Sequence, residues 1–293
     1  MDNWDEIRTA YHVARAGTVS GAAEALGVHH ATVIRHVDAL EARLGVKLFQ
    51  RHARGYTPTE AGQDLLRVAQ TTDDQFAQLA SRIRGRGNDV SGELTVTSLA
   101  MFAPRLAPVL AAFQRDHPRV ILRYMTGTRL FRLEYGEAHV AVRAGPPPQE
   151  PDNVVQPFFH MRAGLYAARS YVEAHGLPEG LDALEGHRFV GPDDETPRAP
   201  TERWLRERLA PDQIAFRSPD PRAQEDAVLA GAGIGFLPPW TAAAHPALVE
   251  VAPPRDVWSS PIWLVTHVDL HRSSKVQALL AALKAAAADW DVA

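Results

Sequence analysis

The sequence predicts a protein of the α/β class overall, in which a small, mainly helical N-terminal module precedes a long helix and a larger α/β domain. Three observations support this prediction. Short helical patterns end at Gly17, Gly27 and Gly45, an apolar stripe at heptad-like spacing lies within residues 59–84, and strand and helix patterns alternate beyond residue 92. Such alternation is typical of a mostly parallel sheet covered by helices. The 293 residues suffice for one small module and a larger two-part domain.

Composition and charge exclude several classes of protein. The net charge is -4, so the chain as a whole lacks the positive charge typical of nucleic-acid binders. The absence of cysteine excludes disulfides, cysteine-ligated zinc and thiol catalysis. The acidic residues 1–6 do not resemble a secretory signal, and glycines and prolines interrupt the longest uncharged stretch, residues 227–244. We therefore expect a cytoplasmic protein without a membrane span.

The first three helical patterns predict a helix-turn-helix. The first helix is expected over residues 2–16, and the second begins at a cap formed by Thr18 or Ser20 and ends at Gly27. Apolar side chains of the third helix share one face: Val33, Val37, Leu40 and Leu44. Arg35 points almost directly away from that face. The outer face is small, polar and basic, which suits it to the major groove of DNA.

Local charge supports contact with DNA phosphates. Five arginine and lysine residues oppose two carboxylates between residues 27 and 56, a local net charge of +3. Residues 47–51 and Tyr56 predict two short strands that form a wing around a basic loop, residues 52–55. Predicted DNA contacts come from the second helix, the third helix and the wing: Ser20, His29, His30, Thr32, Arg35, Arg51 and Arg54.

These predicted DNA contacts differ in kind. Arg35, Thr32 and His30 are expected to contact base edges, with phosphate contact alone as the alternative for each. Arg51 and Arg54 are expected to reach phosphates or the minor groove. Ser20 either donates to a phosphate or caps its helix.

A long helix is predicted over residues 59–84, with Thr57 or Thr59 as its cap. Its apolar stripe extends over roughly 38 Å. The stripe contains six residues: Leu65, Ala69, Thr72, Phe76, Leu79 and Ile83. Either the stripe packs against its own domain or it pairs two copies of the chain; we favour pairing, which predicts a homodimer. The glycine-rich residues 84–92 then form a hinge.

Beyond the hinge we expect eight strands, at residues 93–97, 120–125, 138–142, 154–159, 164–168, 214–216, 234–237 and 262–266. Helices are expected at residues 104–117, 128–135, 201–209, 221–230 and 273–290. Residues 231–235 resemble a dinucleotide-binding loop, but a helix precedes them and a strand follows, which is the reverse of the required order. We therefore predict no cofactor.

The chain resembles a known family of proteins. Residues 17–26, 40–51 and 59–62 closely follow the pattern of the LysR-type transcriptional regulators, and weaker matches at residues 92–96, 165–171 and 230–238 extend the resemblance over the whole chain. Residues 29 and 30 depart from it, because His29 and His30 stand where the family usually has Ser and Gln. Ile34 likewise stands where the family has Ser, so altered base preferences are expected.

The resemblance implies a domain organisation. Residues 1–58 would form a winged helix-turn-helix, residues 59–90 a linker and dimerisation helix with a hinge, and residues 91–293 a two-lobed effector-binding domain like a type 2 periplasmic binding protein. Lobe I would comprise about residues 91–161 and 268–293, and lobe II about residues 162–267. The resemblance also implies binding to double-stranded promoter or operator DNA, control by a small-molecule effector, and homodimers that form tetramers.

The effector site is expected between the lobes. In open α/β lobes, ligands bind at the carboxyl ends of strands and near helix N-termini. This rule selects seven residues: Ser98, Leu99, Gly127, Thr128, Gly191, Pro192 and Phe236. Ser98 and Thr128 are equally well interpreted as ordinary helix caps. An anionic effector would be favoured by nearby arginines: Arg129, Arg132, Arg143 and Arg162.

Two other functions are alternatives to a regulator. An architectural DNA binder with a ligand-free effector domain would show no thermal shift with any metabolite. An α/β enzyme or solute-binding protein lacks support, since no nucleophile–base pair, metal cluster or phosphate loop is present, and we predict no enzymatic activity. A metal site on the third helix is suggested by His29, His30 and His36, which are expected to face the DNA side, but no carboxylate or cysteine completes it. We therefore predict no metal.

Overall fold

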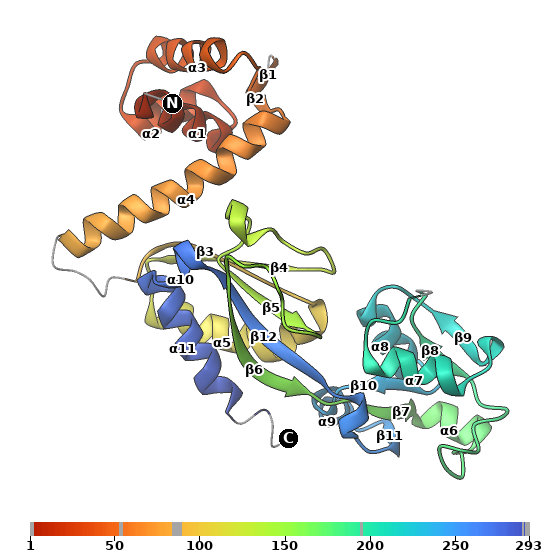
Figure 1. The fold of residues 1–293 in the computed structure, drawn as a ribbon. Coiled ribbons are helices and arrows are strands. Elements are labelled where there is room, and N and C mark those ends of the chain that lie inside the picture. Colours follow the sequence, from red (N-terminus) through yellow and green to blue (C-terminus); the bar gives the residue numbers. More distant parts are fainter. Residues whose placement is uncertain (1–2, 53–54, 84–89, 194–195, 289, 291–293) are drawn as a thin grey trace.

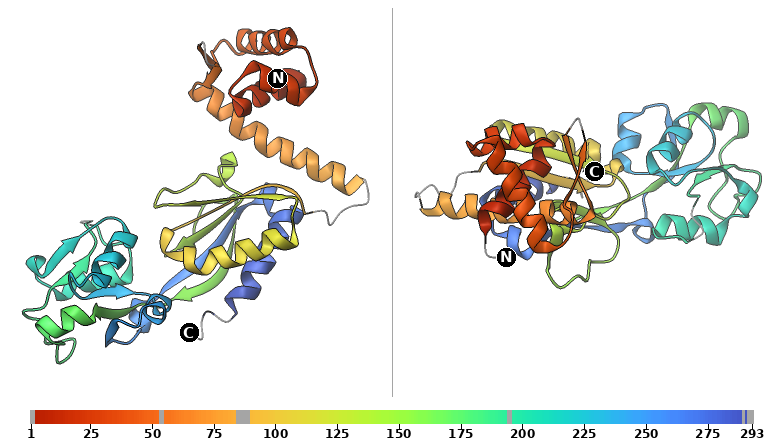
Figure 2. Two further views of the ribbon diagram at one scale, coloured as in Figure 1. Left: turned by 180° about the vertical axis from the view of Figure 1, so that it is seen from behind. Right: turned by 90° about the horizontal axis from the view of Figure 1, so that it is seen from above.

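The computed structural model describes residues 3–52, 55–83, 90–193, 196–288 and 290. Along the chain lie an N-terminal module, the single helix α4 and a C-terminal domain of two lobes connected by extended strands (Figure 1). The view from behind shows the same separation of the parts, and the view from above shows lobe II set apart from the rest of the chain (Figure 2). In the described part of the chain, no helix is long and apolar enough to cross a membrane.

The N-terminal module is the predicted winged helix-turn-helix. It comprises α1 (Trp4–Ala16), α2 (Val19–Leu26), α3 (His30–Leu44), β1 (Phe49–His52) and β2 (Gly55–Pro58). Each helix ends at a glycine in the left-handed conformation, where a side chain would be strained. Thr18 caps α2 by accepting from the amide of Gly21 at 3.1 Å, so Ser20 is not the cap. Val33, Val37 and Leu40 are buried as predicted, but Leu44 is 36% exposed because it lies at the open end of the module.

The wing is fixed to the turn between α1 and α2. β1 and β2 are antiparallel, with Arg51 opposite Tyr56 and His52 opposite Gly55. The amide of Tyr56 donates to the carbonyl oxygen of Gly17 at 2.8 Å. A side chain at Gly55, whose φ is 144°, would collide with that same carbonyl group. The glycine therefore permits the close approach that sets the wing's position.

Helix α4 (Glu60–Ile83) begins against the segment that follows α3. The Thr59 hydroxyl donates to the carbonyl oxygen of Lys47 at 2.7 Å and accepts from the amide of Gly62 at 3.2 Å, so Thr59 is the cap. This pair of bonds joins the start of α4 to the module. The helix then leaves the module and passes over lobe I (Figure 1).

The predicted stripe along α4 is divided in the structure. Leu65 packs against the core of the N-terminal module, and Ala69 is buried. Phe76 and Leu79 remain 50% and 43% exposed. The side chain of Ile83 and most of the predicted hinge, residues 84–89, lie outside the described residues. Packing against the N-terminal module of the same chain therefore buries only the first half of the stripe.

Lobe I is a five-stranded sheet covered by helices. Its strands are β3 (Gly92–Ser98), β4 (Val120–Thr126), β5 (Val140–Ala144), β6 (Asn153–Met161) and β12 (Ser260–His267), in the order β4-β3-β5-β12-β6. Its helices are η1 (Ala100–Phe102), α5 (Ala103–Asp116), η2 (Leu133–Tyr135), α10 (Val268–His271) and α11 (Ser274–Ala287). β3 is parallel to β4 and β5, whereas β12 is antiparallel to β5 and β6. The core contains Leu94, Val96, Phe102, Leu106 and Leu264.

Two expectations for lobe I were wrong. All of β12 belongs to its sheet, since Ser260 already pairs with Met161, so the second connection between the lobes lies just before residue 260 rather than at the expected lobe boundary near residue 267. Lobe II therefore ends earlier than the predicted residue 267. The helix predicted over residues 128–135 is only the single turn η2, and a loop precedes it.

Lobe II is smaller and less parallel than expected. It comprises β7 (Gly164–Ala168), α6 (Arg169–His175), β8 (Phe189–Gly191), α7 (Pro200–Arg208), η3 (Pro211–Gln213), β9 (Ile214–Arg217), α8 (Pro221–Leu229), β10 (Gly235–Leu237), α9 (Pro239–Ala244), β11 (Leu248–Ala252) and η4 (Asp256–Trp258). β7 lies between β10 and β11 and is antiparallel to both, while β8 and β9 are parallel. The mostly parallel layout predicted for the whole domain therefore fails here.

Candidate DNA interface and effector cleft

The outer face of α3 carries the predicted base-contacting residues. Arg35 and His30 are exposed, and Thr32 is half-buried. No side chain among the described residues forms a hydrogen bond or ion pair with Arg35. Its guanidinium group is therefore available to a bidentate acceptor such as a guanine edge. Ser20 is also exposed, on α2.

The residues that depart from the family pattern have separate local roles. The exposed His29 caps α3, because its Nδ1 accepts from the amide of Ala31 at 3.4 Å. In that tautomer, Nε2 carries the proton and can donate outward. Ile34 is half-buried and packs against the core of the module.

His36 does not face the expected DNA side. Its Nδ1 lies 3.0 Å from the hydroxyl oxygen of Thr9 in α1. That hydroxyl donates its proton to the carbonyl oxygen of Asp5 at 2.6 Å, so the Thr9 oxygen accepts from Nδ1–H of His36. The expectation that the side chain of His36 faces the DNA side was therefore wrong. No group of three histidine, aspartate or glutamate residues in the described ranges has the geometry of a metal site.

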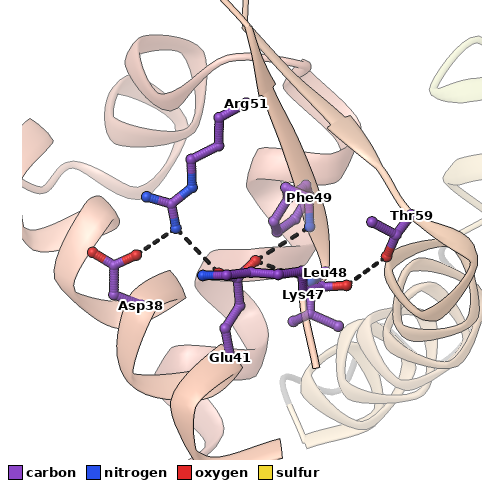
Figure 3. Close-up of polar contacts among 7 residues, drawn as sticks. All are labelled: Asp38, Glu41, Lys47, Leu48, Phe49, Arg51 and Thr59. Atoms are coloured by element: carbon purple, nitrogen blue, oxygen red, sulfur yellow. Dashed lines mark hydrogen bonds and ion pairs between the residues drawn. The ribbon is translucent and has the colours of Figure 1, made fainter. Parts of the chain in front are cut away.

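A buried carboxylate, which sequence reasoning did not select, connects α3 to the wing. Figure 3 shows Glu41 of α3 surrounded by donors. One carboxylate oxygen accepts from the amides of Leu48 and Phe49 at 2.9 and 3.2 Å. The other accepts from Lys47 Nζ at 2.6 Å and Arg51 Nη2 at 3.2 Å. The side chain is only 2% exposed, so these four donors replace its hydration.

Hydrogen bonding decides the charge state of Glu41. Burial by itself would raise the pKa of this carboxyl group, but the hydrogen bonds from Lys47, Leu48 and Phe49 outweigh burial and lower the pKa below its ordinary value. The charged form is therefore the one that the fold stabilises. A carboxylate at the edge of an apolar helix face is a signal for such a role, although its partners follow only from the fold.

The predicted basic patch is largely neutralised within the module. Arg51 forms an ion pair with Asp38 in addition to its bond to Glu41, and its guanidinium carbon lies 5.3 Å from the ring centre of Tyr56. Arg43 pairs with Glu6 of α1. Arg54 lies outside the described residues. Arg51 is thus held across the face between α3 and β1, while Arg35 keeps its free guanidinium group.

An apolar groove lies beside α4 on the N-terminal module. Its walls come from α1, the end of α3, the segment that follows α3 and the first half of α4: Trp4, Ile7, Leu40, Leu44, Val46, Leu48, Ala61, Asp64, Leu65, Val68, Ala69 and Thr72. Trp4, Val46 and Val68 are 39%, 48% and 58% exposed. The ring of Phe76 lies edge-on to that of Trp4 at 5.4 Å, so the exposed half of the α4 stripe continues the groove.

The structure brings the lobe I residues of the predicted effector site together. The amide of Gly127 donates to the carbonyl oxygen of Ser98 at 3.1 Å, at the adjacent carboxyl ends of β3 and β4. Gly127 and Thr128 are exposed, whereas Leu99 packs against the core of lobe I. Across the interlobe boundary, α8 approaches η1. This is the place where the rule for open α/β sheets expects a ligand.

The Ser98 hydroxyl is already engaged. It donates to the carbonyl oxygen of Leu99 at 2.8 Å and lies 2.7 Å from the Tyr124 hydroxyl, which is therefore the donor of that pair. Burial raises the pKa of Tyr124, with the Ser98 bond acting in the opposite direction. Neither proton is free for an anion, so Ser98 and Tyr124 offer lone pairs to a ligand. Sequence reasoning missed Tyr124, whose place beside Ser98 follows from the parallel pairing of β3 and β4.

The lobe II residues of the predicted site have different surroundings. Gly191 is buried at the end of β8, where its carbonyl oxygen accepts from the amide of Ser218 at 3.2 Å, and Pro192 follows it half-buried. Phe236 belongs to an aromatic cluster, with ring centres 5.5 Å from Trp204 and 4.9 Å from Trp258. Phe236 therefore contributes to the core of lobe II, in addition to any contact with a ligand.

Two arginines that were expected to favour an anion are engaged. Arg129 forms a two-pronged ion pair with Glu137, at 2.7 and 2.8 Å. Arg143 donates to the carbonyl oxygen of Phe131 at 2.9 Å. Support for an anionic effector is weaker in the structure than in the sequence.

The fold defines a winged helix-turn-helix protein with a two-lobed C-terminal domain. Comparison with known families agrees: the family described as "LysR substrate binding domain" matches residues 87–288, and that described as "Bacterial regulatory helix-turn-helix protein, lysR family" matches residues 4–63. The chain belongs to the LysR family. The family that the sequence resemblance indicated is thereby confirmed.

Individual relatives give the same result. The HTH-type transcriptional regulator CrgA of Neisseria meningitidis serogroup B is 30% identical over 193 residues, 64% of this chain and 63% of CrgA, so the match spans somewhat less than two thirds of that relative. Full-length LysG from Corynebacterium glutamicum, solved with bound effector Arg, has a TM-score of 0.64 at 20% identity, covering 98% of each chain. Full-length CbnR, solved with its target DNA, has a TM-score of 0.59 at 21% identity, covering 97% of this chain and 100% of that one. The two structures show a shared fold.

Proposed function

We propose that this protein is a transcriptional regulator of the LysR type, which binds promoter DNA in a sequence-specific way and responds to a small molecule bound between its lobes. The observation that carries the proposal is the outer face of α3, where an unpaired Arg35 is presented on a helix that Glu41 fastens to the wing. The relative CbnR was solved with target DNA and LysG with an effector, which supports both halves of the proposal. A protein of this kind would act in the cytoplasm, where promoters are accessible.

Replacing Arg35 by alanine is expected to weaken the footprint on the operator while leaving the fold intact. A bidentate contact between arginine and a base is worth about 1 to 3 kcal/mol, so specific affinity should fall roughly 5- to 150-fold. Footprinting and fluorescence anisotropy on DNA upstream of the protein's own gene would measure this. Arg206→Ala, at an exposed position of α7, serves as the matched control and should bind normally. An unchanged footprint with Arg35→Ala would contradict the assignment of α3 as the reading helix.

We also propose that a second copy of the chain covers the apolar groove and the exposed half of the α4 stripe. Val68 is 58% exposed and Phe76 50%, an arrangement that favours burial in a pair of α4 helices. The tetramers implied by the family remain a prediction.

Val68→Asp is expected to weaken this dimer. A carboxylate buried in an apolar interface without a partner costs several kcal/mol, so the dissociation constant should rise by about 100-fold or more. Analytical ultracentrifugation across a concentration series would detect the resulting monomer. Gln63 lies on another face of α4, so Gln63→Asp is the control for this substitution. A variant that stayed as associated as the unsubstituted protein would exclude this groove as the dimer interface.

For the effector, we propose the edge of lobe I formed by Ser98, Tyr124 and Gly127, facing α8. The lone pairs of Ser98 and Tyr124 favour a ligand with hydrogen-bond donors, such as an amine, amide or alcohol. Thermal unfolding with a panel of metabolites would identify such a ligand. A panel without any shift would favour the alternative, an architectural DNA binder with a ligand-free C-terminal domain.

A further inference from the structure

Three side chains far apart in the sequence meet where the two lobes adjoin. Arg105 of α5, in lobe I, lies over two tryptophan rings: its guanidinium carbon is 5.3 Å from the ring centre of Trp240 and 5.9 Å from that of Trp290. Trp240 belongs to α9 of lobe II, and Trp290 follows α11 at the end of the described chain. We call Arg105, Trp240 and Trp290 the clasp.

The clasp is anchored on lobe I and on a strand that crosses between the lobes. Trp290 lies edge-on to Phe158 and Phe159, with ring centres 5.5 and 5.2 Å apart. Both phenylalanines belong to β6, which leads directly into lobe II (Figure 1). Trp240, although part of lobe II, packs against the core cluster of lobe I. It is therefore the member whose contacts cross the boundary.

Arg105 depends on the two rings for its interactions. Its Nε is buried without a hydrogen-bond partner, and no carboxylate in the described ranges pairs with it. A cation over the face of tryptophan is attracted by the ring electrons, more strongly where water is excluded. A planar guanidinium group can stack on an aromatic face, which a lysine ammonium group cannot do. The pairing thus favours the relative position of α5 and α9 at which all three groups overlap.

We propose that the clasp holds the two lobes at the angle seen in this structure, and that a change of lobe angle removes Trp240 from Arg105. The contact between Arg105 and Trp290 lies within lobe I and persists through such a change. The regulatory consequence rests on the proposed function: an effector that prefers a different lobe angle must first break the clasp, which lowers its apparent affinity.

The lobe angle is measurable without an effector, because the chain has no cysteine. Gln114→Cys in α5 and Glu207→Cys in α7 are exposed positions in the two lobes and can carry spin labels for pulsed electron paramagnetic resonance. In this background, Arg105→Gln removes the cation and keeps part of the aliphatic stem, and Trp240→Leu removes the aromatic face and keeps an apolar side chain. We expect each substitution to shift or broaden the interlobe distance distribution. The population at other lobe angles should rise about three- to tenfold relative to the population at the angle seen in this structure.

Two comparisons separate the clasp from a general loss of stability. Arg115→Ala, exposed on the same helix, should leave the distribution unchanged. The double variant of Arg105→Gln and Trp240→Leu should shift the distribution no further than the larger single effect, because both remove the same contact. Identical distributions in the folded single variants and the unsubstituted protein would overturn the proposal. Neither DNA nor effector takes part, so that failure would leave the proposed function standing, and loss of the proposed function would leave the distances unaffected.

Discussion

Glu41→Ala is expected to lower the free energy of unfolding of the N-terminal module by about 3 kcal/mol, because it leaves the buried amides of Leu48 and Phe49 without an acceptor. The exposed Lys47 keeps its hydration, and Arg51 keeps Asp38, so the loss comes mainly from the two amides. Hydrogen exchange of the α3 and wing amides in the full-length chain would measure it. DNA affinity should fall as well, since α3 and the wing lose their fixed relation.

The same carboxylate makes the stability of the N-terminal module depend on pH in a defined direction. Its pKa is lowered in the folded protein, so the stabilisation is fully present above the ordinary glutamate pKa of about 4.5 and is lost as the pH falls through the lower folded value. The unsubstituted protein should therefore lose protection in this module below about pH 4.5, and Glu41→Ala should lose less there. Asp38→Ala removes only the exposed partner of Arg51 and should cost under about 1 kcal/mol. Equal effects of the two substitutions would contradict the role assigned to Glu41.

Gly62→Ala is expected to destabilise the junction between the N-terminal module and α4 by about 3 kcal/mol or more. A Cβ atom at this position would press into the backbone carbonyl group of Leu48, which cannot move as a flexible side chain can. The carbonyl oxygen of Leu48 also accepts a hydrogen bond from the amide of Thr59 at 2.9 Å, so displacing this carbonyl group disturbs the cap of α4. The expected result is faster hydrogen exchange in both the wing and the first turns of α4, together with weaker operator binding.

Gly180→Ala supplies the control for this substitution. Gly180 lies in an exposed loop of lobe II with nothing near the position of an added Cβ, and its backbone is not in the left-handed region. It should be neutral within about 0.5 kcal/mol. If Gly62→Ala were equally neutral, the close contact between α4 and Leu48 would not be a constraint on the fold.

The sequence predicts the helices of the N-terminal module well because each is stopped by a local signal, a glycine that alone adopts the left-handed conformation without strain. The direction of β12 was beyond local reasoning, since an antiparallel strand in a mostly parallel sheet depends on where the chain crosses between the lobes. Leu44 shows a related limit: it has the right period for the core but lies where the module ends.

The candidate sites divide in the same way. The exposure of Arg35 follows from helix geometry alone, and the meeting of Ser98 with Gly127 follows from the rule for parallel strands. The partners of Glu41, His36 and Arg51 could not be predicted from the sequence. Each partner lies on another element of the module, and the packing of the module sets the distance between the two elements. Contacts of Ser20, His29, His30, Thr32 and Arg35 with DNA stay predictions.

The internal pairing of Arg43, Lys47 and Arg51 has a consequence for how binding responds to salt. Each cation that neutralises a DNA phosphate releases condensed counterions, and the number released sets the slope of affinity against salt concentration. Cations already neutralised by Glu6, Asp38 and Glu41 contribute little to that release. The DNA affinity of each N-terminal module should therefore fall less steeply with salt concentration than its number of basic residues suggests. Discrimination between DNA sequences should then persist at ionic strengths where purely electrostatic binding has been lost.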